Sequence, residues 1–260
     1  MSLTYSNYLK LPELLRLQNV QSDPPQHDET LFIIIHQVYE LWFKLLLHEF
    51  DKIKRDFSSN DLYGASATLK RTRTIMKTLV AQLDILETMT PMSFLSFRDR
   101  LAAASGFQSA QFRELEFLLG HKRPELLKFQ EEGSPARSVL ERRLNEPSLV
   151  DHFYDFLEHR GVQIPAELRD KDIRAPSVPH ERIQQGLINL YRTQPDVANL
   201  LEQVTDFDEG LQEWRYRHVK MVERTIGHRQ GTGGSPGVEF LKESLFKPIF
   251  PDLWEIRDKL

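Results

Sequence analysis

The sequence contains no cysteine in its 260 residues. This absence excludes disulfide bridges, cysteine-ligated iron–sulfur clusters, thiolate-ligated haem and cysteine nucleophiles. Basic residues are not in excess either, because 34 lysines and arginines stand against 38 aspartates and glutamates. The formal net charge of -4 gives no overall positive field that would attract nucleic acid or an anionic membrane, so we expect neither as a partner.

Long apolar runs are also missing. The longest, such as residues 31–35 and 45–47, are far shorter than the roughly 20 residues of a membrane span. Residues 1–10 are polar and aromatic and lack the apolar core of a secretion signal. We therefore expect a soluble cytoplasmic protein. The length and the 40% hydrophobic content suit one large domain as well as two small ones, and we take residues 1–260 as a single domain.

Apolar residues recur at spacings of three and four along almost the whole chain, whereas apolar–polar alternation is rare. This pattern predicts an all-α fold, a bundle of long helices. The predicted helices cover residues 29–57, 69–88, 93–103, 107–119, 135–144, 147–160, 181–193 and 195–226, with short helical pieces in 238–260. Asp28 is the expected cap of the first helix, and the proline-containing residues 161–179 are an expected connection.

Two histidines lie inside the predicted long helices. His218 shares an apolar stripe with Trp214, and His36 has Phe32 one turn before it on the same face. Each could be an ordinary core histidine. In a chain without cysteine, a neutral imidazole is also the natural axial ligand of a haem iron. The cations of residues 214–220 could neutralise haem propionates or another anion.

Arg98 and a glycine-rich string are two further candidates for ligand binding. Arg98 follows Phe94 by one helical turn, so it could stack on an aromatic ring or hold a ligand carboxylate with two hydrogen bonds. Residues 231–237, Gly-Thr-Gly-Gly-Ser-Pro-Gly, could be a flexible linker or a loop that closes over a polar ligand through its amides and the Thr232 hydroxyl.

Together these segments resemble the tryptophan 2,3-dioxygenase family. The resemblance rests on residues 5–11, 27–42, 97–109, 214–218 and 231–235, and it runs in register from Tyr5 to the tail. Members of that family are all-α homotetramers that bind one haem b per subunit. They insert both atoms of O2 across the indole C2–C3 bond of L-tryptophan and form N-formylkynurenine, the first step of tryptophan catabolism through the kynurenine pathway.

The resemblance implies a role for each candidate residue. His218 becomes the axial ligand of the haem iron, and His36 becomes the catalytic distal histidine that contacts the indole N–H. Arg98 and Thr232 hold the carboxylate and the ammonium of the substrate. Phe32, Phe94 and Leu101 line the indole pocket; Ser105, Gly106 and Trp214 belong to the haem site; and Tyr5, Tyr8 and Leu9 reach the site of a neighbouring subunit.

Two other functions fit the same residues. One is a related haem mono-oxygenase that acts on a substituted tryptophan or indole in a biosynthetic pathway. The other is a haem carrier or sensor, or a helical scaffold. Arg98, His36 and Thr232 favour the dioxygenase over the mono-oxygenase. A carrier has no need for a carboxylate-binding arginine beside its haem.

Overall fold

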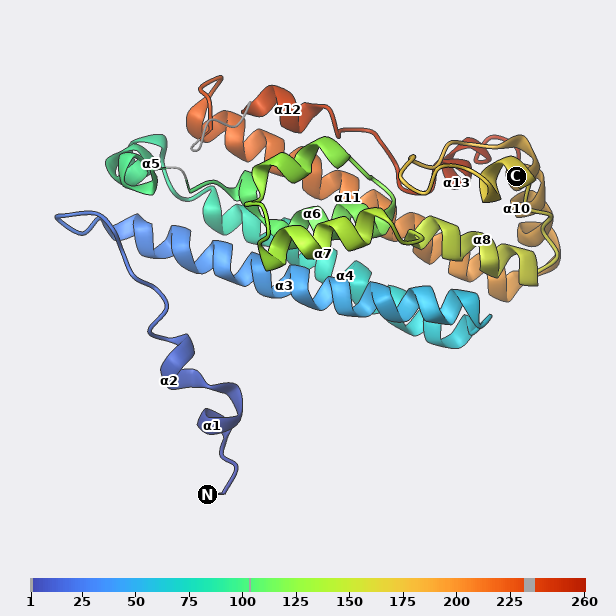
Figure 1. Cartoon of the computed structure of the whole chain (residues 1–260), viewed down its shortest axis with the longest axis horizontal. Coiled ribbons are helices and arrows are strands. Elements are labelled where there is room, and N and C mark those ends of the chain that lie inside the picture. The colour runs from blue at the N-terminus through green and yellow to red at the C-terminus, as the bar shows by residue number, and fades with distance from the viewer. Residues whose placement is uncertain (1, 103, 232–236) are drawn as a thin grey trace.

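The structure is a computed structural model of the chain, and it describes all residues except 1, 103 and 232–236. Three long helices form the centre of the fold: α3 (His27–Ser58), α4 (Leu62–Leu86) and α11 (Pro195–Ile226). They run side by side along the long axis of the molecule, with α4 packed against both α3 and α11 (Figure 1). Within the described ranges every regular element is a helix, which confirms the predicted all-α class.

The remaining helices are shorter. In chain order they are α1 (Tyr5–Leu9), α2 (Leu11–Leu14), α5 (Pro91–Arg98), α6 (Ala110–Leu119), α7 (Pro135–Leu144), α8 (Leu149–His159), α9 (Ala166–Arg169), α10 (Glu181–Thr193), α12 (Val238–Lys242) and α13 (Pro251–Glu255). Three 3-10 turns are η1 (Asp99–Leu101), η2 (Gly106–Gln108) and η3 (Pro124–Phe129). Helices α6 and α8 pack on α3, and α12 packs on α11.

The predicted helices are present, but some of their ends differ. The expectation that Asp28 caps α3 is wrong: the helix begins at His27 after Gln26, and Asp28 lies in its first turn, where a carboxylate interacts favourably with the helix dipole. Helix α4 begins at Leu62, because the Asp61 side chain accepts a hydrogen bond of 2.9 Å from the Gly64 amide.

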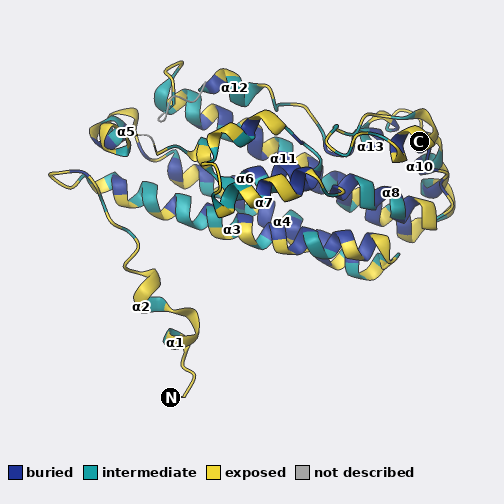
Figure 2. Cartoon of the chain, viewed as in Figure 1, coloured by how far each residue is buried: buried dark blue, intermediate teal, exposed yellow. Residues whose placement is uncertain are grey.

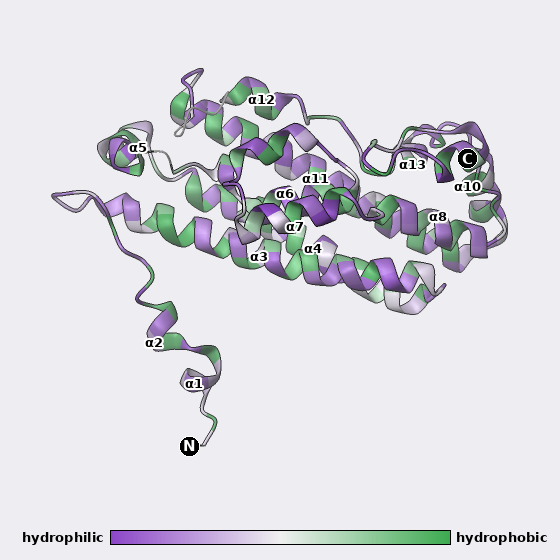
Figure 3. Cartoon of the chain, viewed as in Figure 1, coloured by the Kyte–Doolittle hydropathy of each residue, from purple (hydrophilic) through white to green (hydrophobic). Residues whose placement is uncertain are grey.

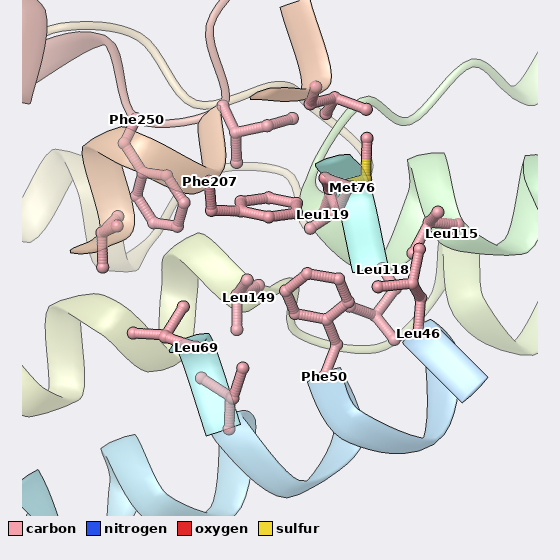
Figure 4. Close-up of a cluster of buried hydrophobic side chains, with 14 of the residues drawn as sticks. Leu46, Phe50, Leu69, Met76, Leu115, Leu118, Leu119, Leu149, Phe207 and Phe250 are labelled. Atoms are coloured by element: carbon pink, nitrogen blue, oxygen red, sulfur yellow. The ribbon is translucent and has the colours of Figure 1, made fainter. Parts of the chain in front are cut away.

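The apolar stripes of the helices meet in one core. Figure 4 shows Phe50 of α3 facing Phe207 of α11, and their ring centroids are 4.8 Å apart in an edge-to-face arrangement. Leu69 and Met76 of α4 and Leu118 of α6 fill the space around them and are almost completely buried. This packing makes the bundle a rigid frame for the adjoining parts of α3 and α11, which carry His36 and His218.

Residues 2–17 form an arm that extends away from the bundle (Figures 1 and 2). The arm is tied to α3 where it leaves the bundle. The buried carboxylate of Glu29 accepts hydrogen bonds from the amides of Gln21 and Ser22 at 2.6 and 3.0 Å, and Gln37 pairs with Gln18 at 2.7 Å. These contacts set the direction in which the arm leaves the bundle.

Helix α3 is long and apolar enough to cross a membrane by length and composition alone. Figure 3 shows apolar residues along much of its length. Central helices of soluble proteins share this property, and one face of α3 packs against α4, α6 and α8. Ile34 and Leu41, on the remaining surface, are exposed.

Candidate active site

A large cavity lies between α3, α5, α6, α11 and α12, with about 1560 Å³ of empty space including its open mouth. His36, Arg98 and His218 all line it. The wall is rich in aromatic side chains, among them Phe32, Phe43, Phe94, Phe107, Phe112 and Phe240.

His36 contributes a neutral imidazole to the wall. Its Nδ1 lies 2.7 Å from the carbonyl oxygen of Phe32, one turn earlier in α3. Burial lowers the pKa of His36, although the hydrogen bond to Phe32 and the charge of Glu40 act in the opposite direction. Because a carbonyl oxygen can only accept, Nδ1 carries the proton, and Nε2 of the neutral ring is left as a hydrogen-bond acceptor.

His218 is a neutral imidazole on α11. Burial, together with the nearby His36 and Arg113, lowers the pKa of His218 to about 4. Its ring stacks on Trp214 at a centroid distance of 5.2 Å and an interplanar angle of 7°, which holds the plane of the imidazole. A neutral, oriented imidazole on a cavity wall has the protonation state that a metal ligand requires.

The residues expected to line an indole pocket are only partly brought together. The Phe32 ring lies 4.1 Å from the His36 ring and 5.7 Å from the Phe94 ring, and all three side chains line the cavity. Leu101 is half-buried against the hydrophobic core but is not among the lining residues. Phe97, which sequence reasoning did not single out, packs behind Phe32 at 5.6 Å.

Arg98 lies at the end of α5 and lines the cavity. Its Nη2 donates a hydrogen bond of 2.6 Å to the carbonyl oxygen of Gln230, directly before the glycine-rich string. The fold therefore brings Arg98 beside the residues that directly precede Thr232 in the sequence. Thr232 itself lies outside the described residues.

Ser105 and Gly106 line the cavity at the turn before α6, and Trp214 lines it beside His218. Tyr5, Tyr8 and Leu9 lie on the arm, where their side chains are 76%, 70% and 41% exposed. They are therefore not part of the cavity of their own chain.

The cavity wall also contains a group of charged side chains that sequence reasoning anticipated only in part. We call it the arginine corner: Arg113, Arg123, Arg215 and Glu116. Arg215 belongs to the cationic residues 214–220, so the sequence carried a signal for it. Arg113 and Glu116 lie on α6, three residues apart, and read as an ordinary surface ion pair until the fold buries them to 5% and 4% exposure.

Comparisons with known proteins identify the family of this chain. The family model described as Tryptophan 2,3-dioxygenase matches residues 1–171 and 176–260. The chain belongs to the tryptophan 2,3-dioxygenase family.

Several curated relatives carry that name. The tryptophan 2,3-dioxygenase of Herpetosiphon aurantiacus is 53% identical over 259 residues, which cover 100% of this chain and 99% of that protein. Those of Anaeromyxobacter sp. (strain K) and Bacillus thuringiensis subsp. konkukian are 47% and 40% identical, again over 100% of this chain and over 97% and 93% of theirs. The similarity therefore extends across the entire cavity and the arm.

Proposed function

We propose that this chain is a haem-dependent dioxygenase that opens the indole ring of L-tryptophan with O2 and yields N-formylkynurenine. The observation that carries the proposal is the convergence of His36, Arg98 and His218 on one aromatic cavity, from three elements far apart in the sequence. The names of the curated relatives support the same substrate and reaction.

The residues of the cavity fit a haem b. Among the described residues, no group of three or more histidine, cysteine, aspartate or glutamate side chains could hold a bare metal ion. A single imidazole suits an iron whose other ligands come from a porphyrin, and His218 would supply it. The aromatic walls suit the apolar faces of the porphyrin, and Ser105, Gly106 and Trp214 would lie beside it.

His36 and Arg98 would hold the substrate. Nε2 of neutral His36 would accept the indole N–H, and the ring would pack on Phe32 and Phe94. Indole N–H is a very weak acid, so we assign His36 to orientation by a hydrogen bond rather than to full deprotonation. Arg98 would exchange its bond with the Gln230 carbonyl for a stronger, charge-assisted pair with the substrate carboxylate, with Thr232 beside it.

The protein would contribute mainly positioning and the exclusion of water. When bound, the haem supplies the iron centre that activates O2. The aromatic wall keeps the indole ring in one place and keeps the site dry, which reduces the entropic cost of bringing the two reactants together. The two-point hold on ring and carboxylate would select a free amino acid over an indole that lacks the carboxylate.

We also propose a soluble cytoplasmic homotetramer of single-domain chains, with residues 1–260 as the domain. Helix α1 carries Tyr5, Tyr8 and Leu9 exposed, away from its own bundle (Figure 2). Apolar side chains on an extended segment are stabilised when a partner covers them. In the tetramer, these three residues would complete the substrate site of a neighbouring subunit.

Reconstitution with haem tests the proposed function directly. The purified chain should bind haem and show a Soret band that shifts when L-tryptophan is added. After anaerobic reduction, addition of L-tryptophan and O2 should produce the absorbance of N-formylkynurenine. A chain that shows no Soret band after haem supply, or a Soret band that L-tryptophan leaves unchanged, would contradict the proposal and favour the scaffold or the carrier, respectively.

A further inference from the structure

The arginine corner contains more positive than negative charge. Glu116 accepts hydrogen bonds from Arg113 and from Arg123, the latter at 2.9 and 3.0 Å. One carboxylate therefore serves two guanidinium groups, and Arg215 adds a third positive charge to the same wall. Arg113, Glu116 and Arg215 are all buried, so water does little to screen this imbalance.

Arg215 is only partly satisfied by the protein. Its Nη1 donates to the carbonyl oxygens of Lys247 at 3.1 Å and Ser244 at 3.5 Å. Nε and Nη2 are buried and have no hydrogen-bond partner among the residues that the structure describes. A guanidinium keeps its proton even when it is buried, so these atoms stay cationic donors that lack an acceptor.

The neighbouring groups do not supply that acceptor. Nε2 of His121 has no hydrogen-bond partner among the described residues, so it does not accept from Arg215. Burial lowers the pKa of His121 to about 4, so this imidazole carries no charge near pH 7. Asp208, two turns before Arg215 on α11, is occupied by the amides of Ile249 and Phe250 at 2.9–3.0 Å and by Trp254 Nε1 at 3.1 Å. The wall therefore keeps an excess of positive charge that favours an anion inside the cavity.

The other arginine of the same run provides a contrast. Arg217 lies on the outside of α11, where its Nη2 donates to Asp84 at 2.6 Å and to Glu87 at 3.4 Å. Its charge is compensated on the surface. Of these two arginines, only Arg215, one turn before His218, belongs to the cavity wall.

We propose that the arginine corner is an anion subsite that binds a carboxylate of the cofactor, namely a propionate of the haem that His218 would hold. This assignment rests on the proposed function and adds to it the residues that bind the anionic edge of the porphyrin. Arg98 would then bind the carboxylate of the substrate and not that of the cofactor. The unpaired buried charge of Arg215 lowers the stability of the protein without cofactor, and the propionate would supply the missing partner.

Haem and its dimethyl ester, in which both propionates are neutral, provide the test. The Kd of each porphyrin is measured by Soret titration for the wild type, Arg215→Met and the matched control Arg217→Met. A charge-assisted hydrogen bond corresponds to about a 10- to 100-fold change in affinity. We expect Arg215→Met to weaken haem binding by this factor and to leave ester binding almost unchanged, while Arg217→Met changes neither.

Urea unfolding of the haem-free variants separates cofactor binding from a structural role. Because methionine removes an unpaired buried charge, haem-free Arg215→Met should be at least as stable as the wild type. Equal losses of haem and ester affinity in Arg215→Met, or a wild type that binds both porphyrins equally, would overturn the inference alone. A wild type that takes up neither porphyrin would overturn both the inference and the proposed function.

Discussion

Replacing Arg98 with methionine should reduce the reaction of L-tryptophan far more than that of tryptamine, which has the same ring and amine but no carboxylate. Truncating one partner of a buried charge pair costs about 2–5 kcal/mol. Arg98 is half-buried and already donates to the Gln230 carbonyl, so the lower part of that range, about 2–3 kcal/mol, applies here. This corresponds to a loss of about 30- to 150-fold in kcat/KM for L-tryptophan.

The assay is steady-state product formation with both substrates. For tryptamine, kcat/KM of Arg98→Met should stay within about threefold of the wild type, because no carboxylate is present to lose its partner. Arg100→Met is the matched control, because Arg100 is an exposed arginine two residues further along the chain. This variant should leave kcat/KM for both substrates unchanged. If Arg98→Met reduced kcat/KM equally for both substrates, Arg98 would support the fold of the site and would not bind a carboxylate.

Three further outcomes follow from the same structure. His36→Ala should lower kcat without abolishing turnover and should leave the Soret band in place; complete inactivity would show that His36 acts as an essential base. Deleting residues 2–17, which include α1 and α2, should leave the helices of the bundle folded but reduce the oligomeric state measured by light scattering and raise KM. If assembly and KM were unchanged, the arm would not contribute to a neighbouring site. The pKa of His121 is about 4 in the folded chain and about 6.5 in the unfolded chain. As the pH falls below 6.5, the unfolded state therefore takes up a proton before the folded state does. This proton uptake lowers the free energy of unfolding between pH 6.5 and 4. Between pH 7 and 5 the haem-free His121→Leu variant should therefore lose about 2 kcal/mol less stability than the wild type in urea unfolding, whereas equal losses would contradict the pKa of His121.

Periodicity predicted the fold wherever a helix was long enough to show an apolar face. The stripe of α11 through Phe207, Leu211 and Trp214 was visible in the sequence, and the predicted helix matches the observed one. Helices α1 and α2 span only five and four residues, too short for such a pattern, and they were missed. The misplaced cap at Asp28 has a similar cause, because several polar residues near a helix start are equally suitable and only the backbone selects one.

The candidate site was predictable where residue type alone restricts the chemistry. His36, Arg98 and His218 stood out as polar residues next to aromatic ones, and the cavity brings them together. Residue type did not reveal Arg113 and Glu116, because an arginine and a glutamate three residues apart are usual on an exposed helix. Their burial is a property of how α6 packs against α3, which a single sequence does not show.

The most direct test of the account is the mass of the product formed from L-tryptophan and isotopically labelled O2 by the haem-loaded chain. We predict an opened indole ring that carries two labelled oxygen atoms from one O2 molecule. A product with a single labelled oxygen would show a mono-oxygenase and contradict the proposed dioxygenase reaction.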